Sequence, residues 1–539
     1  MKKGNVLQNS IIATFCMILC KIIGLIYVIP FNAMISASAG ALYSYAYNIY
    51  VIFLSLSTGG IPIAISKLVS EYDSLKYYKT KEKIYKLGNF IICIIGIFLF
   101  VVMVVFADVI AKFIIGDAVG SNTVSDVSRV IRIISFALLI VPALSVTRGY
   151  LQGHNYMRES SISDVLEQFV RVCIILIGCL VVIKIFKMDE KIAIGISVLS
   201  ASVSALVSYI YLLFKIKKNK KDLIKKNVTE KEVGNKEIIK KIVLCALPFI
   251  IVEVLKSAYA TVDTVTIVRG LTDLGYSVID AETTFSVIAT WGNKLCSIVI
   301  SISFGISMSL IPSVAGEFVK GNIKKVNEQF NSSLLLLLIT TLPMTLGLFF
   351  LGRSVWILFY GYDSLSIEVF KLYIFQAITF SFFSIFISFL QTVNKSKVAL
   401  VTLFISFILN AIFNIPFMHL CHYLGIGGYQ GATVCTLVTQ VLPALFLFIY
   451  TKKKFNFDTK FLVSNGFKII LSTMVMMITL YLVSIFYPIN SINRFSALIE
   501  CLVYGIVGFI MYAFMIYKTG VFKELFGNSR LLKKFKLIH

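Results

Sequence analysis

The chain has 539 residues, of which 58% are apolar and only 14% are charged, and its mean hydropathy is +0.89. This composition lies outside the range of soluble globular domains and excludes an ordinary water-soluble enzyme or binding module. Basic loops on one side of a membrane explain most of the formal net charge of +24, so we expect no nucleic-acid partner.

Apolar stretches of about twenty residues recur along the whole chain, and a helix of that length crosses a hydrocarbon layer of about 30 Å. Because lipid cannot hydrogen-bond to the backbone, such segments are stable there as helices, which satisfy their own polar groups. The fold class is therefore an all-α polytopic membrane protein. We predict fourteen spans, at 10–29, 40–66, 87–107, 127–150, 160–183, 192–214, 242–268, 285–313, 330–352, 369–391, 398–417, 428–450, 467–486 and 495–517.

The lysine-rich loops fall on alternate sides of these spans and predict the orientation of the chain. The loops at 67–86, 215–241 and 452–468, with the tail at 518–539, carry much of the positive charge, so we place them in the cytoplasm. An even number of spans puts both termini there, in a multi-pass protein of the cytoplasmic membrane. Three lysines, Lys184, Lys187 and Lys191, lie on the predicted outer side and indicate either a shifted span or a tolerated exception.

Cysteines and histidines give no sign of a disulfide framework or a metal site. Nearly all of the ten cysteines lie within spans, and no CxxC pair occurs. His419 and His422 are spaced i,i+3 but have no further ligands nearby in the sequence. The sequence also contains no phosphate-binding glycine loop, so we expect neither ATP hydrolysis nor a bound cofactor.

Three short motifs recur in the same order in the second half of the chain. "GGIPIAISKLVSEY" around Pro62 is echoed by "SLIPSVAGEFVKGN" around Pro312, 250 residues later. Similarly, "KFIIGD" at 112–117 is echoed by "ILFYGYD" at 357–363, and "GYLQGHN" at 149–155 by "SFLQTVN" at 388–394. Six spans separate each pair, so the two halves have the same orientation and form a parallel repeat.

The repeat predicts two six-helix lobes that enclose a central cleft and rock to expose it to alternate sides of the membrane. This is a transporter architecture. We predict an N-lobe at 1–214, a basic cytoplasmic loop at 215–241, a C-lobe at 242–450, two extra spans at 451–517 and a cytoplasmic tail at 518–539.

Ionisable residues within the spans are candidates for the lining of the cleft. Each costs on the order of 3 kcal/mol in a lipid-facing position, so such residues normally face a cavity or a partner. They are Lys21 in span one, Arg129, Arg132 and Arg148 near the ends of span four, Asp164, Glu167 and Arg171 in span five, Glu253, Lys256 and Asp263 in span seven, and Lys294 in span eight.

Two interpretations of these charges stay open. Helical spacing puts Lys256 and Asp263 on one face of span seven, and Thr290, Lys294, Ser297 and Ser301 form a polar stripe on span eight, as a water-filled cleft requires. Alternatively, the spacings of Glu253 with Lys256 and of Glu167 with Arg171 fit intrahelical ion pairs that only stabilise a polar face. We expect Arg129 and Arg148 to be anchors at the ends of their span.

Longer segments resemble a known family. "CKIIGLIYVIPF", "GALYSYAYNIYVIFLSLSTGGIPIAISKLVSEY", "GYLQGHN" and "LPFIIVEVLKSAYATVDTVTIV" are similar to the MurJ, SpoVB and YtgP-like branch of the multidrug/oligosaccharidyl-lipid/polysaccharide exporter superfamily. The resemblance covers nearly the whole chain and is strongest over 21–72. It implies a lipid II flippase with a cationic central cavity for the headgroup and a groove for the isoprenoid tail on the two extra helices.

The resemblance also suggests which residues bind the headgroup. Lys21 and Lys294 stand where the family often has arginine, whereas Tyr27 and the neighbourhood of Phe53 supply no arginine. We therefore expect a substrate-binding cationic cavity that contains Lys21, Lys256, Lys294 and Arg171. Glu253, Asp263 and Glu167 are candidates for binding a coupling sodium ion or proton, and the membrane potential alone is a further candidate for the driving force.

Several alternatives remain at this stage. Within the same fold, the substrate could be another polyprenyl-linked polysaccharide, for a capsule or a spore wall, or the chain could be a MATE-type multidrug or cation antiporter. A membrane glycosyltransferase would require a larger outer loop with acid–base residues, and a channel would conduct steadily. We expect a non-enzymatic carrier whose partners are a polyprenyl-diphosphate-linked glycan lipid, membrane lipids and, as candidates, other cell-wall synthesis proteins.

Overall fold

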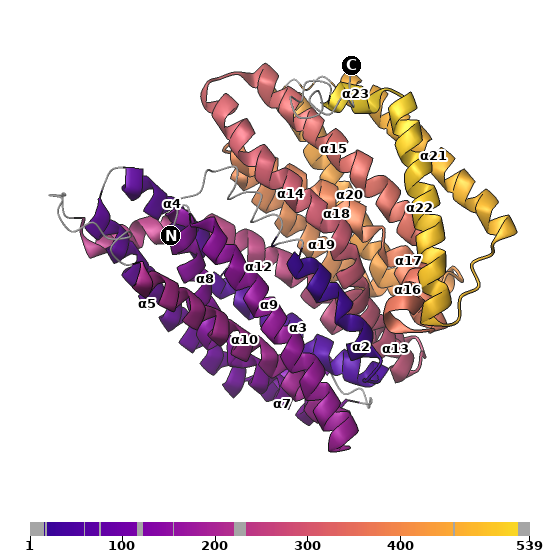
Figure 1. Cartoon of the computed structure of the whole chain (residues 1–539), viewed down its shortest axis with the longest axis horizontal. Coiled ribbons are helices and arrows are strands. Elements are labelled where there is room, and N and C mark those ends of the chain that lie inside the picture. The colour runs from indigo at the N-terminus through magenta and orange to yellow at the C-terminus, as the bar shows by residue number, and fades with distance from the viewer. Residues whose placement is uncertain are drawn as a thin grey trace. The chain divides into compact units, whose positions relative to one another are not determined.

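The structure, a computed structural model, describes residues 16, 19–58, 60–74, 77–115, 122–154, 156–219, 233–455, 457 and 459–526. Parts of several predicted features lie outside these residues, among them the start of span one, the first residue of the motif around Pro62 and the last residues of the motifs at 112–117 and 149–155. The middle of the basic loop, parts of the loops at 67–86 and 452–468 and the end of the tail also lie outside them. Within the described residues, the regular secondary structure is helical throughout (Figure 1).

The first compact unit comprises Met1–Ala289 and the second Thr290–His539. A helix over Leu19–Asn32, which includes α2 (Val28–Asn32), opens the first unit. It is followed by α3 (Ala37–Thr58), α4 (Ile61–Ser74), α5 (Tyr78–Val105), α6 (Ala107–Ile115), α7 (Val124–Ser135), α8 (Ala137–Gly153), α9 (Met157–Cys179), the π-helical turn η1 (Leu180–Ile185), α10 (Glu190–Lys218), α12 (Asn235–Asp273) and α13 (Val278–Ser286).

A second π-helical turn, η2 (Val287–Trp291), contains the boundary between the units. The second unit continues with α14 (Gly292–Val319), α15 (Ile323–Phe350), α16 (Gly352–Tyr360), α17 (Ser364–Tyr373), α18 (Gln376–Thr392), α19 (Ser396–Tyr423), α20 (Gly428–Phe455), α21 (Lys460–Phe486), α22 (Arg494–Lys518) and α23 (Val521–Phe526).

Within the described part of the chain, twelve helical segments are long and apolar enough to cross a membrane, and a shorter apolar helix lies at Leu19–Asn32. The chain is thus an all-α polytopic membrane protein, as predicted. The predicted span seven lies within α12, which has 39 residues but is not among the twelve. Glu253, Lys256 and Asp263 lower the mean hydropathy of this helix. The predicted total of fourteen spans is reached when α12 and the helix at Leu19–Asn32 are added.

The internal repeat is visible in the order and the breaks of the helices. A long helix is interrupted before α6 in the first unit and before α16 in the second, and these two short helices begin 245 residues apart. Breaks also precede α8 and α18, which begin 239 residues apart. The packing recurs as well, since α8 contacts α4, α5 and α10 while α18 contacts α14, α15 and α20.

The position of α12 differs from the predicted lobe boundary. The sequence places this helix at the start of the C-lobe, whereas it packs against α3, α4 and α5 and is part of the first compact unit. Lys241 on α12 donates a hydrogen bond to the hydroxyl of Tyr72 on α4 at 2.9 Å, and Lys83 on α5 donates to the carbonyl of Val233 at 3.0 Å. These contacts attach the first turns of α12 to α4 and α5.

One of the three lysines that break the positive-inside pattern has a specific partner. Lys191 at the start of α10 forms an ion pair with Asp126 at 2.6 Å. Asp126 also closes a capping box with Thr123 at the start of α7. Its hydrogen bonds therefore join the ends of two helices on the predicted outer side, which accounts for one basic residue there.

The short helix α23 packs back on the spans of the second unit. Val521 lies in a buried apolar cluster with Leu335, Ile469 and Ile516. Glu524 accepts hydrogen bonds from Lys468 at 2.8 Å and from Asn465 at 2.5 Å. The hydrogen bond from Lys468 is the main cause of a lowered pKa of Glu524. The start of the predicted tail is thus a helix that packs on α21 and α22.

Two of the repeated motifs pack directly against each other in the first unit. A Cβ atom added to Gly149 would lie 2.4 Å from the carbonyl oxygen of Pro62, and one added to Gly153 would lie 2.7 Å from that of Ser66. Both glycines are on α8 and both carbonyls are on α4. Close approach of these two backbones therefore requires glycine at both positions.

We predict that Gly149→Ala destabilises the purified protein. Alanine in a helix interior is normally favoured over glycine by about 1 kcal/mol, but here its methyl group would collide with backbone that cannot rotate away. The midpoint of thermal unfolding should therefore fall. Gly505→Ala on α22 is the matched control, because no atom lies within 4 Å of its Cβ position. An unchanged or raised midpoint for Gly149→Ala would contradict the close packing of α4 and α8.

Candidate functional site

The densest group of charges in the first unit joins α8 and α9. The guanidinium of Arg148 on α8 lies 3.0 Å from a carboxylate oxygen of Asp164 and 2.9 Å from one of Glu167. Glu167 also pairs with Arg171 one turn further along α9. Arg148 donates a further hydrogen bond to the Ser163 hydroxyl at 2.8 Å. Two carboxylates and two guanidinium groups thus form one network.

This network corrects the expectation that Arg148 is an anchor at the end of its span. Its side chain is only 15% exposed, that of Glu167 is 12% exposed, and both are in direct contact. The predicted pair of Glu167 with Arg171 is present, but Glu167 is shared between two arginines on different helices. The sequence could not reveal this pairing, since it depends on which helices are neighbours.

A row of tyrosines on α3 lies close to Arg171. The rings of Tyr43 and Tyr47 stack at 5.6 Å between centroids, and those of Tyr47 and Tyr50 lie 6.0 Å apart. The three tyrosines lie within electrostatic range of the Arg171 guanidinium. No role was predicted for these tyrosines, although their spacing of four and three residues places them on one face of a helix.

Lys21 lies on the helix Leu19–Asn32, which packs along α9. A Cβ atom on Gly24 would lie 2.9 Å from the amide nitrogen of Gln168, and Cys20 is within electrostatic range of Asp164. Cys20 and Gly24 therefore mark the face toward α9. Lys21 is rotated by about 100° from Cys20, and its side chain is exposed rather than inserted among the charges of α9.

The polar face of α12 packs against α3. The hydroxyls of Ser55 and Ser257 lie 2.6 Å apart, and Asn48 donates to the Thr264 hydroxyl at 3.4 Å. The two pairs are separated by seven residues on each helix, so both belong to one continuous contact between α3 and α12. On the same helix, Lys256 forms the predicted i,i+3 ion pair with Glu253 at 2.9 Å.

The two carboxylates of α12 have different surroundings. The side chain of Glu253 is 44% exposed, whereas Asp263 has only 7% of its surface exposed. Lys256 and Asp263 were expected on one helix face, and both have little exposure. Asp263 is therefore the more buried of the two candidate residues for ion coupling on this helix.

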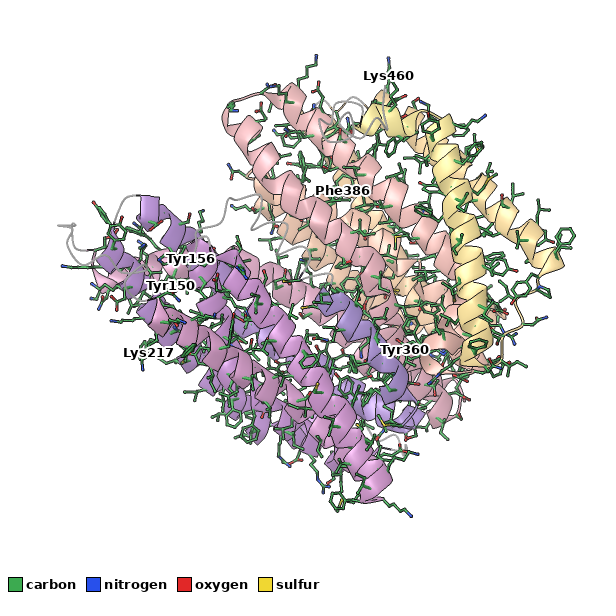
Figure 2. All side chains as sticks on the ribbon, in the orientation of Figure 1. Tyr150, Tyr156, Lys217, Tyr360, Phe386 and Lys460 are labelled. Atoms are coloured by element: carbon green, nitrogen blue, oxygen red, sulfur yellow. The ribbon has the colours of Figure 1, made fainter. Side chains whose placement is uncertain are left out.

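Lys294 is positioned by an aromatic cluster in the second unit. Its amino group lies 4.7 Å from the centre of the Trp291 ring, within the range of a cation–π contact. The hydroxyl of Tyr360, labelled in Figure 2, donates to the backbone carbonyl of Trp291 at 2.8 Å. Tyr360 also packs on Trp356, which in turn contacts Phe370. The cluster thereby fixes the start of α14, which carries Lys294.

The hydroxyls of the predicted polar stripe on α14 bond to their own helix. Ser297 donates to the carbonyl of Lys294 at 2.7 Å, and Ser301 donates to that of Ile298 at 2.6 Å. Both keep acceptor capacity for a ligand or water.

The four residues predicted to bind the substrate come from four helical segments. Lys21, Arg171 and Lys256 belong to the first unit, and Lys294 belongs to the second. Their common cavity stays a prediction. Among the described residues, no group of three or more His, Cys, Asp or Glu side chains could hold a metal ion.

Two family models match successive parts of the chain. A model of polysaccharide biosynthesis proteins matches residues 6–276, and the MatE model matches residues 288–415. The first match covers half of the sequence. The chain belongs to the polysaccharide biosynthesis protein family. The family resemblance predicted from the sequence is thereby confirmed.

A curated relative and several solved structures are similar to most of this chain. The lipid II flippase MurJ of Bacillus subtilis (strain 168) is 28% identical over 536 residues, which cover 97% of each chain. A solved structure of the lipid II flippase MurJ in an inward closed conformation has a TM-score of 0.69 at 16% identity, over 95% of this chain and 99% of that one. An inward-facing multidrug resistance MATE family transporter has a TM-score of 0.65 at 10% identity, over 81% and 94%. These structures share the fold of this family member.

We predict a strong energetic coupling between Arg148 and Glu167. Removing one partner of a buried ion pair leaves the other charge without compensation and typically costs about 3–5 kcal/mol. Arg148→Met and Glu167→Gln should each lower the free energy of unfolding, and the double variant should lose less than their sum, by about 1–3 kcal/mol. Unfolding of the purified variants in denaturant measures the cycle, and strictly additive losses would refute the pairing. Arg129→Met, which changes an exposed arginine of α7, is the control.

Proposed function

We propose that this protein is a lipid II flippase of the cytoplasmic membrane, with both termini in the cytoplasm. It moves the undecaprenyl-diphosphate-linked peptidoglycan precursor from the inner to the outer leaflet by alternating access and converts no substrate chemically. The observation that carries this proposal is the match to the MurJ relative over 97% of both chains. The repeated arrangement of helices supports the transport mechanism, because parallel repeats are a known basis for alternating access.

The headgroup would bind to Lys21, Lys256, Lys294 and Arg171. A diphosphate requires cations in a wet cleft, and lysine can meet phosphate oxygens as a point charge from several directions. The side chain of Lys21 is exposed on its helix. Lys256 is held by Glu253 at 2.9 Å, so binding of the diphosphate would exchange one ion pair for another. Other cell-wall synthesis proteins are candidate partners for delivery and use of the lipid.

The isoprenoid tail would lie along the last two spans. Large apolar side chains on both helices are exposed, including Met474 and Ile478 on α21 and Leu502 and Phe509 on α22. A tail of many isoprene units needs such a surface through the thickness of the membrane. These two helices have no counterpart in the repeat, which agrees with a function specific to a long lipid.

A coupling ion would bind at Asp263, with Glu253 and Glu167 as further carboxylates, and no other cofactor is proposed. Asp263 is nearly buried on a helix that packs against α3. Alternatively, the membrane potential supplies about 2.3 kcal/mol per 100 mV for each charge moved across, which is enough to bias the cycle.

A second candidate function is that of a MATE-type multidrug or cation antiporter, since the MatE model matches residues 288–415. Another polyprenyl-linked polysaccharide, for a capsule or spore wall, is the alternative substrate within the flippase class. Cations on four helical segments favour an anionic lipid over a cationic drug.

Depletion of the protein should cause lipid II to accumulate in the cytoplasmic leaflet of the producing cell. Lys21→Gln and Lys294→Gln should fail to restore export at normal membrane levels, because each removes a cation from the headgroup site. Lys453→Gln, a change of an exposed lysine at the end of α20, should restore it fully. If a different lipid-linked glycan accumulates, that glycan is the substrate. If both lysine variants are fully active, Lys21 and Lys294 do not bind the headgroup.

Asp263→Asn should abolish any sodium or pH dependence of flipping in proteoliposomes. The amide cannot carry the negative charge that a sodium ion or proton would neutralise. Glu253→Gln serves for comparison. Because Glu253 is more exposed, its substitution should reduce the sodium or pH dependence of flipping less than Asp263→Asn does. A transport rate that responds to sodium and pH equally in the wild type and in Asp263→Asn would exclude Asp263 as the coupling residue.

A further inference from the structure

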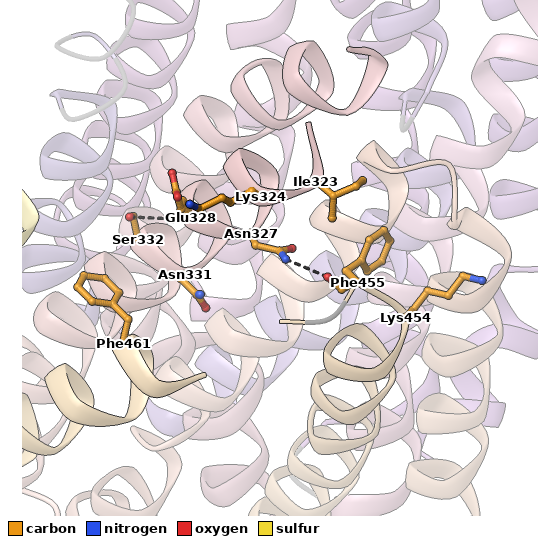
Figure 3. Close-up of a pocket in the computed structure, with 9 residues that line it drawn as sticks. All are labelled: Ile323, Lys324, Asn327, Glu328, Asn331, Ser332, Lys454, Phe455 and Phe461. Carbon is orange, nitrogen blue, oxygen red and sulfur yellow. Dashed lines mark hydrogen bonds between the residues drawn. The ribbon is translucent and has the colours of Figure 1, made fainter. Parts of the chain in front are cut away.

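A cavity of about 880 Å³, lined by charged, amide and apolar side chains, opens at the predicted cytoplasmic end of the second unit (Figure 3). The first turns of α15, the last turn of α20 and the start of α21 form its walls. Its lining residues are Ile323, Lys324, Asn327, Glu328, Asn331, Ser332, Lys454, Phe455 and Phe461. In Figure 3, Asn327 lies between Lys324 and Lys454, whereas Asn331, Ser332 and Phe461 lie on the side away from Lys454.

The charges of this cavity match a ligand with a single negative charge. Among the described residues of the lining, two lysines and one glutamate give a net charge of +1. Both lysine side chains are exposed, so their flexible stems can bring the amino groups over a ligand at the cavity mouth. A diphosphate would require more cations than this lining supplies.

One asparagine provides an acceptor for a hydroxyl donor. The amide nitrogen of Asn327 donates to the carbonyl of Phe455 at 2.9 Å, which fixes the orientation of the side chain. The oxygen of the same amide is buried and has no hydrogen-bond partner in the part of the chain that the structure describes. Because this oxygen is buried, a ligand O–H or N–H group would satisfy it only after the Asn327 side chain turns toward the cavity.

An apolar groove of about 460 Å³ begins one helical turn away. Leu334 of this groove follows Asn331 of the cavity by three residues on α15, and Leu462 directly follows Phe461 on α21. The rest of the groove comes from α18 and α20 and includes Phe382, Phe386, Ala444 and Phe448, of which Phe386 is labelled in Figure 2. Its one hydroxyl, that of Thr379, already donates to Gln440 at 2.6 Å.

A ligand that fills both spaces must combine an anionic, hydroxyl-bearing head with a hydrocarbon chain. We propose that the cavity and the groove together bind a phospholipid of the inner leaflet whose head is a phosphodiester monoanion with free hydroxyls, as in phosphatidylglycerol. The phosphate lies between Lys324 and Lys454, a head hydroxyl donates to Asn327, and an acyl chain occupies the groove. This lipid is a resident ligand and is not transported, and the site does not depend on the proposed flippase activity.

Native mass spectrometry of the full-length protein with added phosphatidylglycerol or phosphatidylcholine tests the proposal. Phosphatidylglycerol should be retained preferentially. The double variant Lys324→Gln/Lys454→Gln should bind it roughly thirtyfold more weakly, from about a fivefold loss for each lysine. The double variant Lys325→Gln/Lys453→Gln is the matched control, because it removes the same charge from neighbouring exposed lysines outside the cavity.

A second pair of variants tests the groove independently of charge. Ala444→Phe should fill the groove and reduce retention, whereas Gly505→Phe, at an exposed position of α22 with open space around it, should not. Equal retention of the two phospholipids, equal losses in both lysine double variants, or displacement of phosphatidylglycerol by a polyprenyl diphosphate at equimolar concentration would each overturn the assignment.

Discussion

The ion network around Arg148 allows α9 to carry two carboxylates and a guanidinium among apolar helices. Each of these groups alone would be costly away from water, and together they compensate one another over distances of about 3 Å. Since Arg148 comes from α8, the network also determines which face of α9 is turned toward its neighbour. On the same helix, Arg171 lies near the tyrosines of α3 and Gln168 lies against Gly24. The charges that lie near the proposed headgroup site therefore have a structural function as well.

Most of the helices could be predicted from the sequence, because an apolar stretch of about twenty residues indicates a helix that is surrounded by lipid. The repeat could be predicted because three motifs recur in the same order. The breaks before α6 and α16 could not, since Phe106 and Leu351 continue an apolar pattern on both sides. Pro62 illustrates the opposite case. The sequence identifies its motif only as part of the repeat. The structure shows a packing role as well, because Gly149 packs against the backbone carbonyl of Pro62.

The candidate site was predictable only at the level of single helices. Helical spacing correctly anticipated the ion pairs of Glu253 with Lys256 and of Glu167 with Arg171. Arg148 was misjudged because its distance from the span end is a property of one helix, whereas its partners lie on another. The contact of Lys294 with Trp291 had a local signal, a spacing of three residues, but the support from Tyr360 comes from 69 residues further along.

The π-helical turn η2 lies where the two compact units meet in the sequence. The boundary between the compact units lies between Ala289 and Thr290, within this turn, and not in the long basic segment that separates the repeats in sequence. A turn with wider hydrogen-bonded rings is a weak point in a helix. The chain therefore passes from one compact unit to the other inside an apolar membrane-spanning segment, where the regular hydrogen-bonded ladder of the helix is interrupted.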